Sequence, residues 1–117
     1  GAGWMTYAML GCDRSFFIER ACARTNNRPS ELIKQHCFTA VESLEPVEQL
    51  VEAYGADNFF IGTDFPHPEF QFLPNYITHI LDRRISEDDK AKILGGNLAR
   101  ALKIPATADA APVGASA

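Results

Sequence analysis

One short segment, residues 58–69, limits most strongly what this chain can fold into. It contains an apolar run of high β-propensity, Phe59–Ile61, followed by a glycine, a threonine and Asp64. Pro66 and Pro68 then stop the strand, because proline cannot donate a hydrogen bond to a β-ladder. Asp64 is therefore predicted to lie where a buried strand ends and a loop begins.

A carboxylate at the end of a strand has two interpretations. In α/β folds, and in β/α barrels above all, catalytic groups lie at this position, where a carboxylate can bind a metal, orient a water molecule or accept a proton. An aspartate after a strand also makes Asx-turns or caps the next helix. His67, three residues later, could contact a substrate or stabilise the loop by bonding to the backbone. From this segment alone both interpretations stay open.

Hydrophobic periodicity predicts helices that alternate with two short strands. The expected helices cover residues 4–23, 29–35, 46–54, 76–81 and 86–101, and the expected strands cover residues 37–41 and 59–62. Because crossover helices connect parallel strands, this order predicts an α/β fold with a parallel sheet. Two strands cannot close a β/α barrel, which typically needs about 250 residues.

Two of the expected helices carry features that predict how they pack. In the helix after Pro46 the expected core face consists of Val47, Leu50, Val51 and Tyr54, and Gly55 ends the helix. In the last helix Ser86 is the expected N-cap, and the expected core face consists of Ala91, Leu94, Leu98 and Ala101. The adjacent Gly95 and Gly96 either permit close approach to a strand or mark a kink.

Composition and charge narrow the class of protein. A chain of 117 residues with 46% hydrophobic and 22% charged residues is typical of one modest soluble domain. A net charge of −4 without a basic stripe argues against nucleic-acid binding. The apolar start is too short to cross a bilayer and lacks the basic region of a signal peptide, so we expect no membrane partner and a cytoplasmic location.

The cysteines and the end of the chain give two further expectations. Cys12, Cys22 and Cys37 form an odd set without a Cys-x-x-Cys pair, so we expect small buried hydrophobic residues in a reducing compartment. Residues 105–117 are rich in alanine and proline and lack periodicity, which predicts a disordered tail.

The segment Gly62-Thr63-Asp64-Phe65-Pro66-His67-Pro68 resembles the last-strand signature of the amidohydrolase-related family, in the branch that includes aminocarboxymuconate-semialdehyde decarboxylase. Other segments resemble the same family in the same order: Gly3-Trp4 with Tyr7 and Asp13, Arg28-Pro29-Ser30-Glu31, His36-Cys37-Phe38, and Lys92-Ile93-Leu94-Gly95-Gly96-Asn97-Leu98-Ala99-Arg100. The resemblance covers residues 1–104. It implies strands seven and eight, with their flanking helices, of a metal-dependent-hydrolase TIM (β/α)8 barrel.

The resemblance also implies a role for the strand-end residues. Asp64 would bind Zn²⁺ or another divalent metal and transfer a proton in a hydrolase or non-oxidative decarboxylase, and His67 would contact a small-molecule substrate. The family's His-x-His pair is missing, and one carboxylate falls short of the three ligands of a catalytic zinc. We therefore expect a homo-oligomer or a missing N-terminal half. The alternative is a non-catalytic remnant, or an interaction module that packs against a partner chain.

The sequence leaves the roles of several other residues open. His36 is expected at a helix end and His79 at the surface of an amphipathic helix. Glu42 ends the first strand and could shape a pocket, whereas Glu69 is expected to be a solvated loop residue. Two aromatic residues could wall a substrate pocket or serve in packing: Trp4 and Tyr7.

Overall fold

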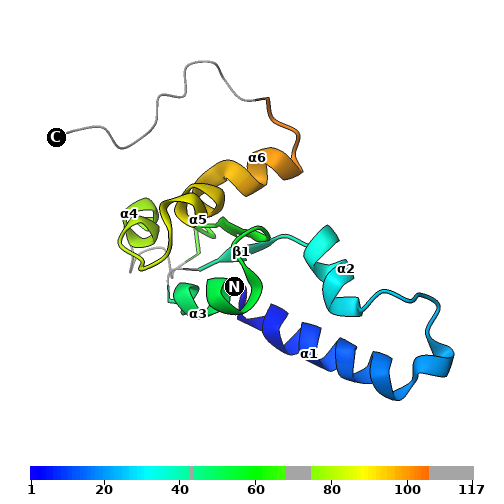
Figure 1. The fold of residues 1–117 in the computed structure, drawn as a ribbon. Helices are drawn as coiled ribbons and strands as arrows, with labels where there is room; N and C mark the ends of the chain where they lie inside the picture. Colours follow the sequence, from blue (N-terminus) through cyan, green and yellow to red (C-terminus); the bar gives the residue numbers. More distant parts are fainter. Residues whose placement is uncertain (43, 68–74, 106–117) are drawn as a thin grey trace.

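A computed structural model describes residues 1–42, 44–67 and 75–105 of the chain (Figure 1). Its elements, in order, are α1 (Gly3–Ile18), the 3₁₀-helix η1 (Arg20–Cys22), α2 (Pro29–His36), β1 (Thr39–Val41), α3 (Val47–Tyr54), β2 (Phe59–Ile61), α4 (Tyr76–Leu81), α5 (Glu87–Ala91), the π-helical η3 (Lys92–Gly96) and α6 (Asn97–Ala101). The expected tail lies almost wholly outside the described residues, so its disorder stays a prediction.

The two strands pair in parallel, as the sequence predicts, and α3 connects them. Thr39 pairs with Phe59 and Val41 with Ile61. The first strand begins two residues later than expected. The Asn58 side-chain amide donates hydrogen bonds to the carbonyl oxygens of Lys34 and Cys37, at 2.6 and 2.8 Å, so the Cys37 carbonyl is not part of the strand pairing. The fold is thus mixed α/β, consistent with part of a β/α barrel.

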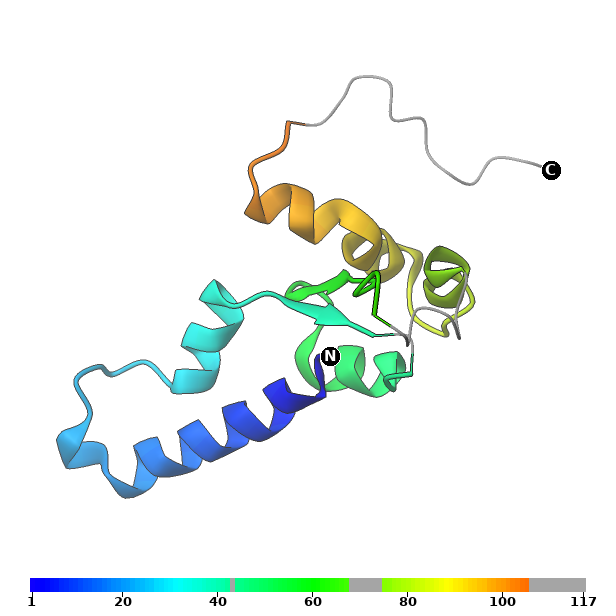
Figure 2. The same cartoon turned by 180° about the vertical axis from the view of Figure 1, so that it is seen from behind.

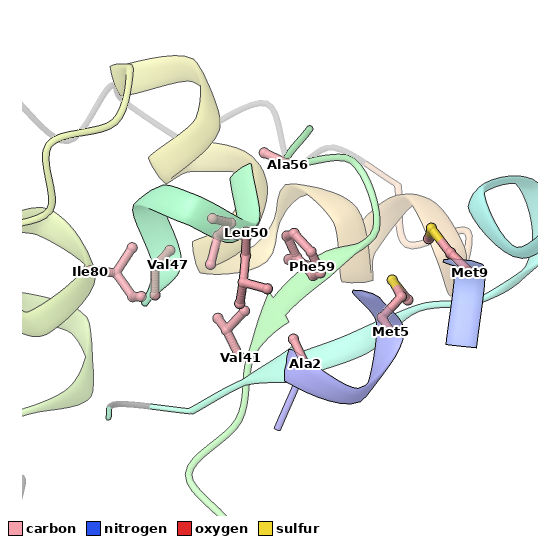
Figure 3. Packing of buried hydrophobic residues seen from close by; sticks show 10 residues of the cluster. Ala2, Met5, Met9, Val41, Val47, Leu50, Ala56, Phe59 and Ile80 are labelled. Atoms are coloured by element: carbon pink, nitrogen blue, oxygen red, sulfur yellow. The ribbon is translucent and has the colours of Figure 1, made fainter. Parts of the chain in front are cut away.

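Helices lie on both sides of the strand pair. Figures 1 and 2 show α1 and α3 on one side and α5 and α6 on the other. Figure 3 shows the core between them, where α3 and α4 meet through Val47 and Ile80 while Phe59 fills the centre. The buried core consists of Ala2, Met5, Met9, Val41, Val47, Leu50, Ala56, Phe59, Ile80 and Ile93. Residues from both ends of the described chain therefore share one core.

The packing expected for α3 and the cap expected for α5 are confirmed. Val47 and Leu50 are buried, and Val51 and Tyr54 pack against the same core. Gly55 ends α3 with a φ of 77°, a conformation that favours glycine. The Ser86 hydroxyl accepts a hydrogen bond from the Asp89 amide at 3.1 Å and so caps α5.

The core face expected for the last helix is wrong. Ile93 and Asn97 are buried, whereas Ala91, Leu98 and Ala101 are exposed and Leu94 is half-buried. The helix is also interrupted by the π-helical segment Lys92–Gly96, in which Gly95 is non-helical. The glycine pair therefore marks a kink. Nothing lies within 4 Å of a Cβ placed on Gly95, so close approach does not require it.

The expectation of buried cysteines is also wrong in part. Cys12 is exposed and Cys37 half-buried, and both thiols are free. Cys12 is exposed although its spacing in α1 places it on the same side of the helix as the buried residues Met5, Met9 and Phe16. Within the part of the chain that the structure describes, no helix is both long and apolar enough to cross a membrane.

Candidate functional site

The polar residues that follow the two strands lie at one edge of the sheet. Because β1 and β2 are parallel, their carboxyl ends lie at the same edge. Glu42 follows β1 directly, and Gly62, Thr63 and Asp64 follow β2. In parallel α/β folds this edge is where ligands bind. The sequence prediction that Asp64 lies between a strand and a loop is confirmed.

Asp64 has an uncommon backbone conformation. Its φ is 52°, in the left-handed region that aspartate adopts more readily than most residues. Its carbonyl oxygen accepts a hydrogen bond from the His67 amide at 2.7 Å, which closes a turn after the strand. Within that turn the Phe65–Pro66 peptide bond is cis. The turn leaves the carboxylate side chain 69% exposed, so a substrate or ion can reach it.

His67 lies beside this carboxylate. Its Nδ1 atom is 3.9 Å from Oδ2 of Asp64, and its side chain is 52% exposed. At that distance the two groups form an ion pair only when the imidazole is protonated. The structure thus brings together the two site residues that the sequence singled out. Both are open to solvent at the carboxyl edge of the sheet.

Two further carboxylates lie at the same edge. The Gly1 ammonium donates a hydrogen bond to Glu42 Oε1 at 2.5 Å, and this bond raises the pKa of the ammonium above 8.0. The negative charges of Glu45 and Asp64 raise the same pKa, although burial opposes them. Glu42 and Glu45 therefore both contact the residues at the start of α1.

Glu45 has a role that the sequence analysis missed. Its carboxylate accepts hydrogen bonds from the amides of Ala2, Gly3 and Glu42 at 2.8, 2.6 and 2.9 Å. Partial burial raises the pKa of this carboxyl, but the three backbone donors outweigh burial and leave the pKa below 4.5. Glu45 therefore fastens the loop after β1 to the start of α1. Two of its three donors, Ala2 and Gly3, lie more than 40 residues away in the sequence, so the local sequence does not mark this role.

Gly62 allows the two strands to approach closely at the site. A Cβ atom placed on this glycine would lie 2.8 Å from the Cβ of Ala40 in β1. Real Cβ atoms do not approach so closely without a shift of the backbone. Glycine at position 62 therefore does more than end β2, because a larger residue would clash with Ala40.

The described residues do not form a catalytic metal site by themselves. Among residues 1–42, 44–67 and 75–105, no group of three His, Cys, Asp or Glu side chains could hold an ion. A catalytic zinc normally takes three protein ligands and keeps one position open. Asp64, with His67 beside it, could supply at most two donors. The carboxylate thus fits as one ligand of a site that other groups would have to complete.

The other candidate residues lie on helices or outside the described residues. His36 ends α2, as expected, and His79 is partly exposed on α4 and contacts an Arg83 guanidinium nitrogen. Trp4 is 53% exposed, so about half of it is covered by the described residues, whereas Tyr7 is 84% exposed and packs little against them. Glu69 lies outside the described residues. A groove of about 540 Å³ opens elsewhere, between α4 and the α5–η3 segment, and is lined by Ile77, Leu81, Glu87, Asp88, Lys90, Ala91 and Leu94.

Comparison with known proteins supports the resemblance. The family model described as Amidohydrolase matches residues 4–104, which is most of the chain. No curated protein sequence and no solved structure matches it. Members of the matched family are typically metal-dependent.

Proposed function

The chain belongs to the amidohydrolase family, and from this premise we propose that it forms the sector of a (β/α)8 barrel that carries strands seven and eight. Residues 1–104 would be that sector. The parallel pair β1 and β2, with α3 crossing between them, supports this assignment. We place the chain in the branch that includes aminocarboxymuconate-semialdehyde decarboxylase, on the strength of residues 62–68.

The observation that carries the proposed function is the position of Asp64. It lies at the carboxyl end of β2, in a left-handed conformation, with its carboxylate 69% exposed. A group held in this way by a turn is oriented for use by a ligand, since the turn fixes the backbone before anything binds. We propose that Asp64 is both a metal ligand and the residue that transfers a proton.

The proton transfer can be stated for both reactions of the family. In hydrolysis Asp64 accepts a proton from the attacking water and delivers it to the leaving group. In decarboxylation Asp64 accepts a proton from a water molecule, which leaves hydroxide, and delivers it to the carbon atom whose bond to the departing CO₂ breaks. His67, 3.9 Å from the carboxylate, would donate a hydrogen bond to a small-molecule substrate at the same edge. Zn²⁺ or another divalent ion would supply a Lewis acid once the remaining strands complete its site.

Asp64→Asn tests this role in the complete enzyme, with the remaining strands supplied in the same polypeptide or as a second one. The substitution keeps the size of the side chain but removes its charge. We expect kcat to fall at least about 100-fold, the lower end of a general acid–base contribution. Ester and lactone hydrolysis and CO₂ release are measured in parallel. Glu52→Gln, on the exposed side of α3, is the matched control and should leave kcat unchanged.

The metal content of each variant is measured with its turnover. Near-normal turnover by Asp64→Asn with unchanged metal content would exclude both roles of Asp64. A loss of turnover with unchanged metal content would retain proton transfer and exclude ligation.

A further inference from the structure

The two strands carry different residues on their two faces, because side chains alternate along a strand. Val41 of β1 and Phe59 of β2 lie on one face and are buried in the core (Figure 3). The opposite face carries Ala40 and Phe60, which pair with each other and are half-buried. The second face is therefore the less covered of the two.

Glu42 continues this second face at the carboxyl end of β1. It follows Ala40 by two residues and lies across from Gly62, since the preceding residues of the two strands pair. Gly62 lies on the same face, because a Cβ atom placed on it would lie 2.8 Å from the Cβ of Ala40. Glu42 therefore lies beside the short segment that leads from β2 to Asp64.

Glu42 and Asp64 both act on one cation. The Gly1 ammonium donates a hydrogen bond to Glu42 Oε1 at 2.5 Å, and this bond is the main cause of the raised pKa of the ammonium. The charge of Asp64 raises the same pKa. The Glu42 side chain is 44% exposed, so a group from solvent can reach it. A positive charge at this position is thus stabilised by both carboxylates.

The complete enzyme would leave Glu42 without this cation. When the remaining strands precede Gly1 in one polypeptide, its nitrogen becomes an uncharged peptide nitrogen. Among the described residues no other ion pair engages the Glu42 carboxylate. A carboxylate that is partly removed from water attracts a cation more strongly than one in bulk water, because the effective dielectric constant is lower. A substrate can supply the missing charge.

We propose that Glu42 binds a protonated amino group of the substrate and so selects amine-bearing substrates for the reaction at Asp64. The inference rests on the proposed function, which places the substrate at this edge of the sheet. Glu42 holds the amino group through a charge-assisted hydrogen bond. Asp64 keeps its role in proton transfer, so the two carboxylates act on different parts of one molecule.

Two probes of similar shape test this specificity in the complete enzyme made as one polypeptide. β-Alaninamide ends in an ammonium group, whereas butanamide ends in a methyl group. Their dissociation constants are measured by NMR titration, which requires no turnover. We expect β-alaninamide to bind at least about tenfold more tightly, because only its ammonium forms a charge-assisted hydrogen bond with Glu42. Glu42→Gln should bring the two constants to within about threefold of each other.

Two further variants make the result specific to this carboxylate. Glu52→Gln removes a carboxylate from the exposed side of α3 and should leave the ratio of the two constants unchanged. Glu42→Lys should make butanamide the tighter ligand, because the introduced ammonium repels that of β-alaninamide. Equal binding of the two probes by the native enzyme, or an unchanged ratio in Glu42→Gln, would overturn the inference. Failure of the proposed function is seen separately, as near-normal turnover by Asp64→Asn.

Discussion

Replacing Asn97 with alanine should destabilise the chain more than the same replacement at an exposed asparagine. Asn97 is completely buried, and its side-chain amide donates hydrogen bonds to the carbonyl oxygens of Ala56 and Phe59, each at 2.7 Å. These bonds fasten the start of α6 to the start of β2, about 40 residues earlier in the sequence. This side chain therefore helps to hold the strand that presents Asp64 at its opposite end.

The expected loss follows from these two hydrogen bonds. Each contributes about 1 kcal/mol net, and truncation leaves two buried acceptors with one partner fewer. Among the described residues Oδ1 of Asn97 has no donor, so its removal offsets part of the loss. We expect Asn97→Ala to lower the free energy of unfolding by about 2 kcal/mol, which corresponds to roughly 10 °C in Tm for a domain of this size.

Urea unfolding and calorimetry measure this loss. Asn26→Ala, at an exposed position between α1 and α2, is the matched control and should change Tm by less than about 2 °C. Asn97→Asp should be at least as destabilising as alanine at neutral pH, because it turns a carboxylate oxygen toward two carbonyl oxygens. If Asn97→Ala has the same Tm as the native chain, the two hydrogen bonds do not stabilise β2, and the prediction is refuted.

Two further results are expected from the carboxyl edge of the sheet. Since the folded-state pKa of Glu45 lies below 4.5, its stabilisation is fully present above that pH and is lost as the pH falls through the lowered value. Glu45→Gln should therefore lower Tm at pH 7, and in acid the Tm of the variant should approach that of the native chain. A Tm difference that stays constant across pH would contradict this prediction. Gly62→Val should lower the free energy of unfolding by about 1–3 kcal/mol through a clash with Ala40. Adding Ala40→Gly should recover part of that loss in urea unfolding, and equal midpoints for Gly62→Val and the native chain would refute the close approach.

Much of the fold could be predicted from the sequence because its signals are local. The strand Phe59–Ile61 is bounded by a glycine and prolines, and α3 by a regular apolar period and Gly55. The pairing in parallel followed from the crossover alone. The candidate site was also a local signal, because Asp64 and His67 lie within one turn.

The rest could not be predicted because it depends on distant partners or on a change of helical phase. Asn97 resembled an ordinary polar residue of an amphipathic helix, and only the carbonyl groups of residues 56 and 59 explain its burial. Glu45 gains its role from the start of α1 in the same way. The core face of the last helix was misplaced by one position, since Ile93 and Asn97 are buried in place of Leu94 and Leu98. Apolar periodicity also does not mark the π-helical segment Lys92–Gly96.

The metal content of the purified chain tests most directly the central claim that Asp64 is one ligand of a site completed elsewhere. The chain is dialysed against trace zinc, and the metal bound per chain is measured by mass spectrometry. We expect far less than one zinc per chain, because the described residues supply at most the two donors of Asp64 and His67. Stoichiometric zinc that is lost in Asp64→Ala would show that this chain holds a complete ligand set, and would contradict the account.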